Sequence, residues 1–152
     1  MYETMRRIAA LIEDERNLIA NLANAAAVLG EDLDDINWAG FYLWDGSELV
    51  LGPFWGQPAC IRIPLGKGVC GTALAEQRTI IVPDVHAFPG HIACDPHSRS
   101  EIVVPMLTPA GHRLGVIDID SPFTSRFTDD DGRGLGEIAQ LLIDGCDWPV
   151  HQ

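Results

Sequence analysis

Basic residues are scarce in this chain of 152 residues, which has 10 lysines and arginines against 22 aspartates and glutamates and a formal net charge of −12. A negative field of this size repels the phosphate backbone of nucleic acids and the anionic surface of membranes. The sequence has no apolar run of about 18 residues, which a transmembrane helix needs, and its first residues lack the basic and apolar regions of a signal peptide. We therefore expect a cytoplasmic protein that binds neither nucleic acid nor a membrane.

Several familiar motifs are also absent. The four cysteines, Cys60, Cys70, Cys94 and Cys146, form no C-x-x-C pair, which argues against zinc ribbons and thioredoxin-like sites. There is no G-x-S-x-G, no Walker loop and no G-x-G-x-x-G. In a reducing compartment, several cysteines in a small domain are more often reactive or metal-binding than structural. The cysteines are therefore the first candidates for chemistry.

The hydrophobic pattern predicts an α+β fold. A chain of this length, 47% hydrophobic, is expected to form one domain with a core that needs no disulfide or metal. Thr4 is expected to cap the first helix and Gly30 to end it. The patterns predict a helix over 4–29, strands over 36–44, 48–54 and 60–63, a helix over 66–76, strands over 79–82, 101–107 and 114–121, and a helix over 129–143. Hairpins between terminal helices favour helices packed on one face of an antiparallel sheet.

Aromatic residues gather in the first expected strand. Alternation places Trp38, Gly40 and Tyr42 on one face, so the glycine is expected to leave a gap between two rings. Such a gap suits a cation or a methyl group on sulfur. Ordinary packing of the two rings in the core is the alternative interpretation.

Two carboxylates alternate with apolar residues in the last expected strand. Leu114, Val116, Asp118 and Asp120 are expected on one face, and Gly115, Ile117 and Ile119 on the other. Glu101 opens the preceding strand and can join them. Buried carboxylates without partners are costly, so they usually hold a cation, accept hydrogen bonds or share a proton. The alternative is a solvated strand end.

The segment 83–100 has no regular pattern, and loops of this length in compact domains are usually functional. It carries His86, His91, Cys94 and His97, which suggests either a zinc site or a thiol activated by nearby imidazoles.

Cys70 follows a glycine-rich turn at the expected start of a helix, where amide donors and the helix dipole favour a thiolate or a bound anion. From spacing alone, Cys70 and Cys94 are equal candidates for a nucleophile. Cys60 lies ten residues before Cys70, and Cys146, near the C-terminus, has no evident role.

Eight stretches together resemble a known enzyme family. They read DINWAGFY at 35–42, LGPF at 51–54, ACIRIP at 59–64, GVCGTA at 68–73, DVH at 84–86, GHIACD at 90–95, SEIV at 100–103 and GVIDIDS at 115–121. In order and spacing the chain resembles the free methionine-(R)-sulfoxide reductases, which are single GAF-domain enzymes, over residues 15–143. The resemblance implies one GAF domain over 1–152. It also implies a central antiparallel sheet with the N- and C-terminal helices on one face and active-site loops on the other.

The resemblance also implies a thiol reaction. In this family the cysteine that matches Cys94 attacks the sulfoxide sulfur, which yields free methionine and a sulfenic acid. The cysteine that matches Cys60 resolves the sulfenic acid as a disulfide, and the one that matches Cys70 takes part in disulfide exchange. Thioredoxin then reduces the disulfide, and NADPH reduces thioredoxin again through thioredoxin reductase. No bound cofactor and no metal is expected.

The remaining site residues follow from the same resemblance. Trp38 and Tyr42 match the aromatic walls around the substrate methyl group, whereas Glu101, Asp118 and Asp120 match acidic residues that bind substrate and assist proton transfer. The physics agrees, since carboxylates neutralise the ammonium group of a free amino acid. The sulfoxide oxygen must leave as water, which needs a protonated carboxyl group, and like-charge repulsion in an acidic cluster provides one.

Several points stay open at this level. The sequence does not decide whether Cys60 or Cys70 resolves first, which carboxylate donates the proton, or whether 66–71 or 83–100 supplies amides for the substrate carboxylate. A homodimer through the terminal helices is left open. A non-catalytic GAF sensor, or a zinc or redox switch built on the histidines near Cys94, remains the alternative function.

Overall fold

The computed structural model describes residues 1–91, 96–149 and 151. The elements are α1 (Tyr2–Ile12), α2 (Leu18–Asp32), β1 (Trp38–Trp44), β2 (Glu48–Gly56), β3 (Arg62–Pro64), α3 (Gly68–Glu76), β4 (Ile80–Val82), a 3₁₀ turn η1 (Val85–Ala87), β5 (Ser100–Leu107), β6 (Arg113–Ser121) and α4 (Asp129–Gly145). The strands form one antiparallel sheet in the order β3-β2-β1-β6-β5-β4.

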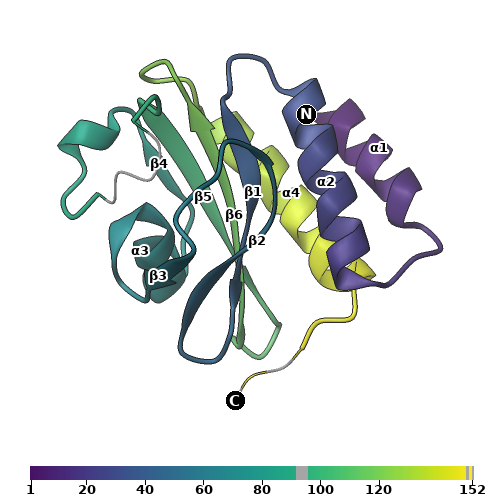
Figure 1. Ribbon diagram of the computed structural model, residues 1–152. Coiled ribbons are helices and arrows are strands. Elements are labelled where there is room, and N and C mark those ends of the chain that lie inside the picture. Colours follow the sequence, from purple (N-terminus) through teal and green to yellow (C-terminus); the bar gives the residue numbers. More distant parts are fainter. Residues whose placement is uncertain (92–95, 150, 152) are drawn as a thin grey trace.

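Helices cover the two faces of the sheet unequally (Figure 1). On one face, α2 packs on β1 and β2, α4 packs on β5, and α1 packs on both helices. On the other face lie α3 and the segment that follows β4. The expected α+β architecture, with terminal helices on one face and site loops on the other, is therefore confirmed. We call the two apolar layers the helix-side core, which includes Phe41 and Ile117, and the pocket-side core, which includes Tyr42 and Val116.

The single helix expected over 4–29 is wrong, because it is two helices. α1 begins at Tyr2, with Met1 rather than Thr4 at its N-cap, and ends at Ile12. The charged run 13–16 carries no apolar residue to pack, and Asn17 starts a new helix by accepting a 2.9 Å hydrogen bond from the Ala20 amide.

Gly30 does not end the second helix, which continues to Asp32. The Trp55 ring occupies the space in which a side chain at position 30 would lie, so the glycine serves close packing of β2 on α2.

Side chains alternate along β6 as expected, with one exception. Ile117 and Ile119 belong to the helix-side core, whereas Val116 belongs to the pocket-side core. Leu114 was expected beside Val116 but lies in the helix-side core. The cause is a one-residue register shift, since Met106 pairs with Gly115 but Leu107 pairs with Arg113.

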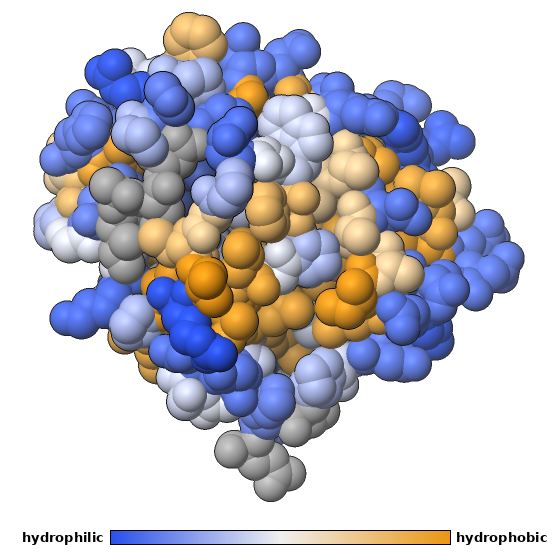
Figure 2. Space-filling model, viewed as in Figure 1, coloured by the Kyte–Doolittle hydropathy of each residue, from blue (hydrophilic) through white to orange (hydrophobic). Residues whose placement is uncertain are grey.

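α4 forms despite its three glycines. Thr128 and Asp131 make a capping box at its start, and three aspartates occupy its first turn, where the helix dipole favours negative charge. Among the described residues, no helix is both long enough and apolar enough to cross a membrane. Figure 2 shows apolar residues gathered near the middle of the viewed face, with hydrophilic residues around them.

Candidate active site

The acidic residues lie side by side because of the strand register. Asp120 on β6 pairs with Trp38 on β1 at one side and with Glu101 on β5 at the other. These three side chains therefore form one row across three strands. Asp118, two residues before Asp120, lies on the same face of β6 and pairs with Gly40. The alternation found in the sequence thus becomes a cluster of three carboxylates beside an aromatic ring.

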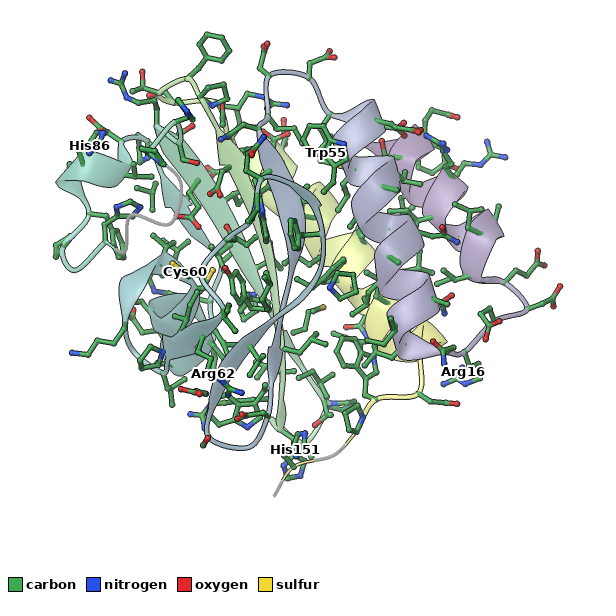
Figure 3. All side chains as sticks on the ribbon, viewed as in Figure 1. Arg16, Trp55, Cys60, Arg62, His86 and His151 are labelled. Atoms are coloured by element: carbon green, nitrogen blue, oxygen red, sulfur yellow. The ribbon has the colours of Figure 1, made fainter. Side chains whose placement is uncertain are left out.

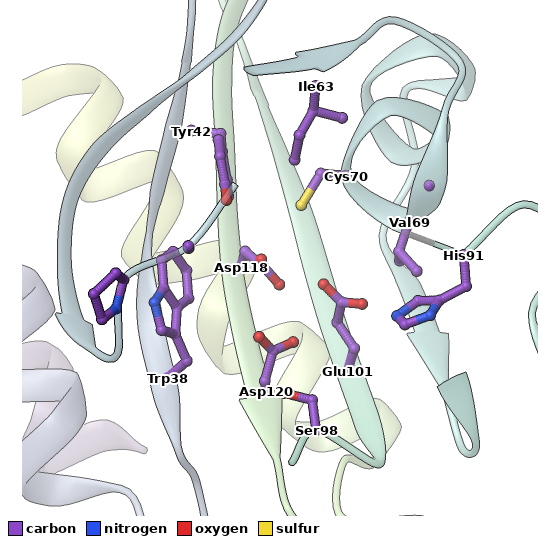
Figure 4. A pocket seen from close by; sticks show the side chains of 13 residues that line it. Trp38, Tyr42, Ile63, Val69, Cys70, His91, Ser98, Glu101, Asp118 and Asp120 are labelled. Carbon is purple, nitrogen blue, oxygen red and sulfur yellow. The ribbon is translucent and has the colours of Figure 1, made fainter. Parts of the chain in front are cut away.

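The N-terminal turn of α3 closes this face of the sheet to form a pocket (Figure 4). Residues from several parts of the chain line it, namely Trp38, Tyr42, Pro58, Ala59, Ile63, Gly68, Val69, Cys70, His91, Ser98, Glu101, Asp118 and Asp120. All three carboxylates and both aromatic residues expected at the site are present, together with Cys70. Cys94 lies outside the described residues.

The carboxylates at the base of the pocket are buried, with Glu101 7% and Asp118 5% exposed. Burial, together with repulsion from Asp118 and Asp120, raises the pKa of Glu101 well above its usual 4.5. Burial also raises the pKa of Asp118, although hydrogen bonding to Glu101 and Cys70 acts in the opposite direction. Glu101 is therefore the member of the cluster most suited to hold a proton at neutral pH.

Asp118 has an unsatisfied acceptor. Its Oδ1 atom is buried and has no hydrogen-bond partner among the described residues. A buried acceptor without a donor costs about 1–3 kcal/mol. The pocket therefore favours a proton or a cationic group at this atom.

Aromatic rings form one wall of the pocket. The Trp38 ring stacks on Tyr42 at a centroid distance of 5.9 Å and on Phe54 at 5.3 Å. The gap expected above Gly40 is absent, because Phe54 and the Pro53 carbonyl occupy the space in which a side chain at position 40 would lie. The open volume lies instead between the ring wall and the carboxylates (Figure 4).

Hydrogen bonds join the aromatic wall to the chain segment before β3. Trp38 Nε1 donates to the carbonyl of Gln57 at 3.1 Å, and the Tyr42 hydroxyl donates to the carbonyl of Cys60 at 2.8 Å. Burial, followed by repulsion from the carboxylates, raises the pKa of Tyr42 above its usual 10, so this hydroxyl stays protonated and remains a donor. The wall and the cysteine segment are thus one connected unit.

The described cysteines differ in their state. Cys60 is disulfide-bonded and half-buried just before β3, which begins at Arg62 rather than at position 60 as expected (Figure 3). Cys70 and Cys146 are free and buried. Burial and the three carboxylates raise the pKa of Cys70 well above its usual 9.0, so its thiol is protonated and a poor nucleophile.

Cys146 lies far from the pocket, in the helix-side core. Its Sγ accepts a 3.5 Å hydrogen bond from Asn21 Nδ2, and burial raises its pKa. The expectation that it has no part in the site agrees with this position.

The pocket also contains residues from both segments that the sequence leaves open as sources of amides, 66–71 and 83–100. Gly68 and Val69 line it at the start of α3, where the N-cap residue Lys67 makes no side-chain hydrogen bond to the helix. Backbone amides of a helix N-terminus favour an anion there. Ser98, which is buried, accepts a 3.2 Å hydrogen bond from Asn37 Nδ2. Nothing in the sequence pattern distinguishes Ser98, because it lies in a segment without periodicity.

Two histidines of the segment 83–100 interact with each other, and one of them lines the pocket. His86 is exposed and His91 lines the pocket, and burial, with repulsion from His86, lowers the pKa of His91. Within the described ranges, neither they nor His97 belong to a group of three potential metal ligands. The alternative zinc site with Cys94 includes a residue outside those ranges.

Comparison with known proteins identifies relatives. The family model described as GAF domain matches residues 3–143. The chain is 53% identical over 137 residues to the free methionine-R-sulfoxide reductase of Escherichia coli strain K12, covering 90% of this chain and 82% of that protein. It also resembles the free methionine-R-sulfoxide reductase of Neisseria meningitidis solved in complex with its substrate, at 48% identity, a TM-score of 0.90 and coverage of 94% and 86%. The reduced form of the Staphylococcus aureus enzyme gives 52% identity, a TM-score of 0.91 and coverage of 95% and 93%.

Proposed function

The chain belongs to the GAF-domain free methionine-R-sulfoxide reductases, and we propose that it reduces free L-methionine (R)-sulfoxide to L-methionine. The observation that carries the proposal is one pocket in which an aromatic wall faces three carboxylates, two of them buried, below the N-terminus of a helix. A free amino acid has an apolar methyl group, an ammonium group and a carboxylate, and the pocket offers a partner for each.

Charge complementarity orients the substrate in this proposal. The substrate ammonium lies near Asp118 and Asp120, where it supplies the donor that Asp118 Oδ1 lacks. The substrate carboxylate lies at the amides of Gly68 and Val69, which we favour over the loop 83–100 because both residues line the pocket. The methyl group then packs against Trp38 and Tyr42. A peptide-bound sulfoxide lacks both terminal charges and does not fit.

Glu101 is the proposed proton donor. Its raised pKa keeps a proton on the carboxyl group at neutral pH, as a general acid requires. The thiolate of Cys94 attacks the sulfoxide sulfur, the oxygen passes to the cysteine sulfur, and the products are methionine and a sulfenic acid. When a second thiol attacks that sulfenic acid, a disulfide forms and the oxygen leaves as water.

Cys60 is the proposed first resolving thiol. It is half-buried, disulfide-bonded and held at its carbonyl by Tyr42, whereas Cys70 is a buried thiol with a raised pKa among carboxylates. A thiol of the second kind reacts slowly. Cys70 is therefore assigned to later disulfide exchange.

Thioredoxin is the proposed reductant, with NADPH supplied through thioredoxin reductase and no bound cofactor. Ile61, beside Cys60, is 66% exposed and offers an apolar contact for an approaching protein. We place the protein in the cytoplasm in this proposal, because its thiol cycle needs a reducing compartment. A homodimer stays part of this proposal and is checked by light scattering.

The test is turnover of free methionine (R)-sulfoxide with thioredoxin, thioredoxin reductase and NADPH. The (S) epimer and a peptide-bound sulfoxide serve as controls and should not react. A Cys94→Ser variant should lose turnover completely. Tight binding of the free (R) sulfoxide without consumption would instead make the protein a sensor, and full turnover in Cys94→Ser would reassign the nucleophile.

A further inference from the structure

Three potential metal ligands from three different elements meet inside the pocket. The Cys70 sulfur from α3 and a carboxylate oxygen each from Glu101 on β5 and Asp118 on β6 lie within 4.8 Å of one another. All three residues are buried, and Figure 4 shows the Cys70 sulfur pointing from the helix toward the two carboxylates. Across the part of the chain that the structure describes, no other group of this kind occurs.

A second observation points to a cation at this place. Asp118 Oδ1 is buried without a hydrogen-bond donor, and none of the described residues that line the pocket is a lysine or an arginine. Two buried carboxylates without a basic partner are costly, and a bound cation relieves that cost.

We propose that Cys70, Glu101 and Asp118 form a binding site for a thiophilic divalent cation of the zinc class. Sulfur among the donors favours zinc over magnesium or calcium, which take oxygen ligands. In a tetrahedral zinc site neighbouring donor atoms lie about 3.5 Å apart, which small side-chain rotations reach from the observed spacing. The fourth position faces the pocket and holds water. On binding, the Cys70 thiol releases its proton to solvent.

The cation competes with the substrate. It takes the same carboxylates that the substrate ammonium and the transferred proton need, so zinc should inhibit by raising KM for free methionine sulfoxide. This inhibition rests on the proposed function, whereas the metal site itself does not.

Cobalt(II) is the probe that tests the site without turnover. The full chain is titrated with Co²⁺ while its Cys60 disulfide is kept intact, so that Cys70 and Cys146 are the free thiols among the described cysteines. A thiolate-to-cobalt charge-transfer band in the near ultraviolet should appear and should vanish on adding Zn²⁺. The band should be lost in Cys70→Ser and retained in the matched control Cys146→Ser.

The carboxylates are tested in the same way. Glu101→Gln and Asp118→Asn should each weaken Co²⁺ binding by at least about tenfold, with folding of each variant verified by thermal unfolding. Absence of the band in the wild-type chain, or a band that survives Cys70→Ser, overturns the proposal. If the band behaves as expected but no sulfoxide is consumed, the metal site stands and the proposed function fails. If an active enzyme binds Zn²⁺ without a rise in KM, the competition is wrong.

Discussion

The Tyr42 hydroxyl donates a 2.8 Å hydrogen bond to the backbone carbonyl of Cys60. One residue of the aromatic wall therefore holds the backbone of the cysteine that we propose as the resolving thiol. Binding of the substrate methyl group and placement of the second sulfur thus depend on the same side chain.

Replacing Tyr42 by phenylalanine should keep the ring and remove this hydrogen bond. We expect a loss of about 1 kcal/mol in the free energy of unfolding and a several-fold fall in kcat with little change in KM. The reason is that the ring still packs on the substrate while Cys60 is less well placed. Trapping of the sulfenic acid with dimedone during a single turnover should show a longer-lived intermediate. Tyr2→Phe, at an exposed tyrosine on α1, is the matched control. An unchanged lifetime of the sulfenic acid in Tyr42→Phe would show that Tyr42 does not assist formation of the disulfide.

Glu101→Gln should change the pH dependence of stability. The folded protein keeps a proton on Glu101 at pH values where the unfolded chain has released it, because burial and the aspartates raise the folded pKa above 4.5. The free energy of unfolding therefore falls as pH rises from that ordinary value toward the raised one. Glutamine removes this dependence, and its amide gives Asp118 a donor.

We therefore expect the thermal midpoint of Glu101→Gln to exceed that of the wild type by a few degrees at about pH 8 and by less at about pH 5. Turnover should fall at least about tenfold, since the proton donor is lost. Glu137→Gln, at an exposed glutamate of α4, should change neither the thermal midpoint nor turnover. Equal midpoints for Glu101→Gln and the wild type at both pH values would argue against a proton held at Glu101.

Ile61→Asp should slow reduction of the protein by thioredoxin without slowing its reaction with the sulfoxide. Ile61 is exposed next to Cys60, so a charge there should hinder docking of thioredoxin but not of a small dithiol. We expect the thioredoxin-coupled rate to fall about tenfold or more while the rate with dithiothreitol stays within twofold of the wild type. Ile19→Asp, at an exposed position of α2, controls for the added charge. Equal losses with both reductants would place the effect in the site rather than in docking.

Gly40→Ala and Gly136→Ala should have opposite effects on stability. A side chain at position 40 would overlap Phe54 and lie 2.9 Å from the Pro53 carbonyl, whereas position 136 has no atom within 4 Å. The first change should cost about 1–3 kcal/mol through overpacking and disturb the stacking of Phe54 on Trp38. The second should gain up to about 1 kcal/mol because it removes a glycine from a helix. Urea unfolding measures both, and a stable Gly40→Ala would contradict the close packing of β1 on β2.

The sequence predicts the chemical character of the site better than its geometry. Alternation in 114–121 correctly places Asp118 and Asp120 on one face, since a strand with a period of two leaves no other choice. It does not reveal that Glu101 pairs with Asp120, because register depends on the partner strand, and a slip of one residue would turn Glu101 away. The row from Trp38 to Glu101 is therefore a property of the sheet.

The errors have local causes of the same kind. Apolar spacing continues across the break at 13–17 and therefore predicts one helix, although Asn17 marks the new N-cap. The pattern of β1 alone predicts a gap at Gly40, whereas Phe54, the residue paired with Gly40 on β2, fills it. Leu114 lies on the helix side for a similar reason. In each case the neighbouring strand or helix decides what the local pattern leaves undetermined.

The alternation along β6 from position 116 to 120 also bears on how such a domain can evolve. Asp118 and Asp120 line the pocket, whereas Ile117 and Ile119 are packed in the helix-side core. Mutations at the first set can alter ligand preference without repacking the second. Residues that determine ligand contacts and residues that determine core packing are therefore separate on this strand, and a library restricted to the pocket positions 101, 118 and 120 should yield folded proteins with new ligand preferences.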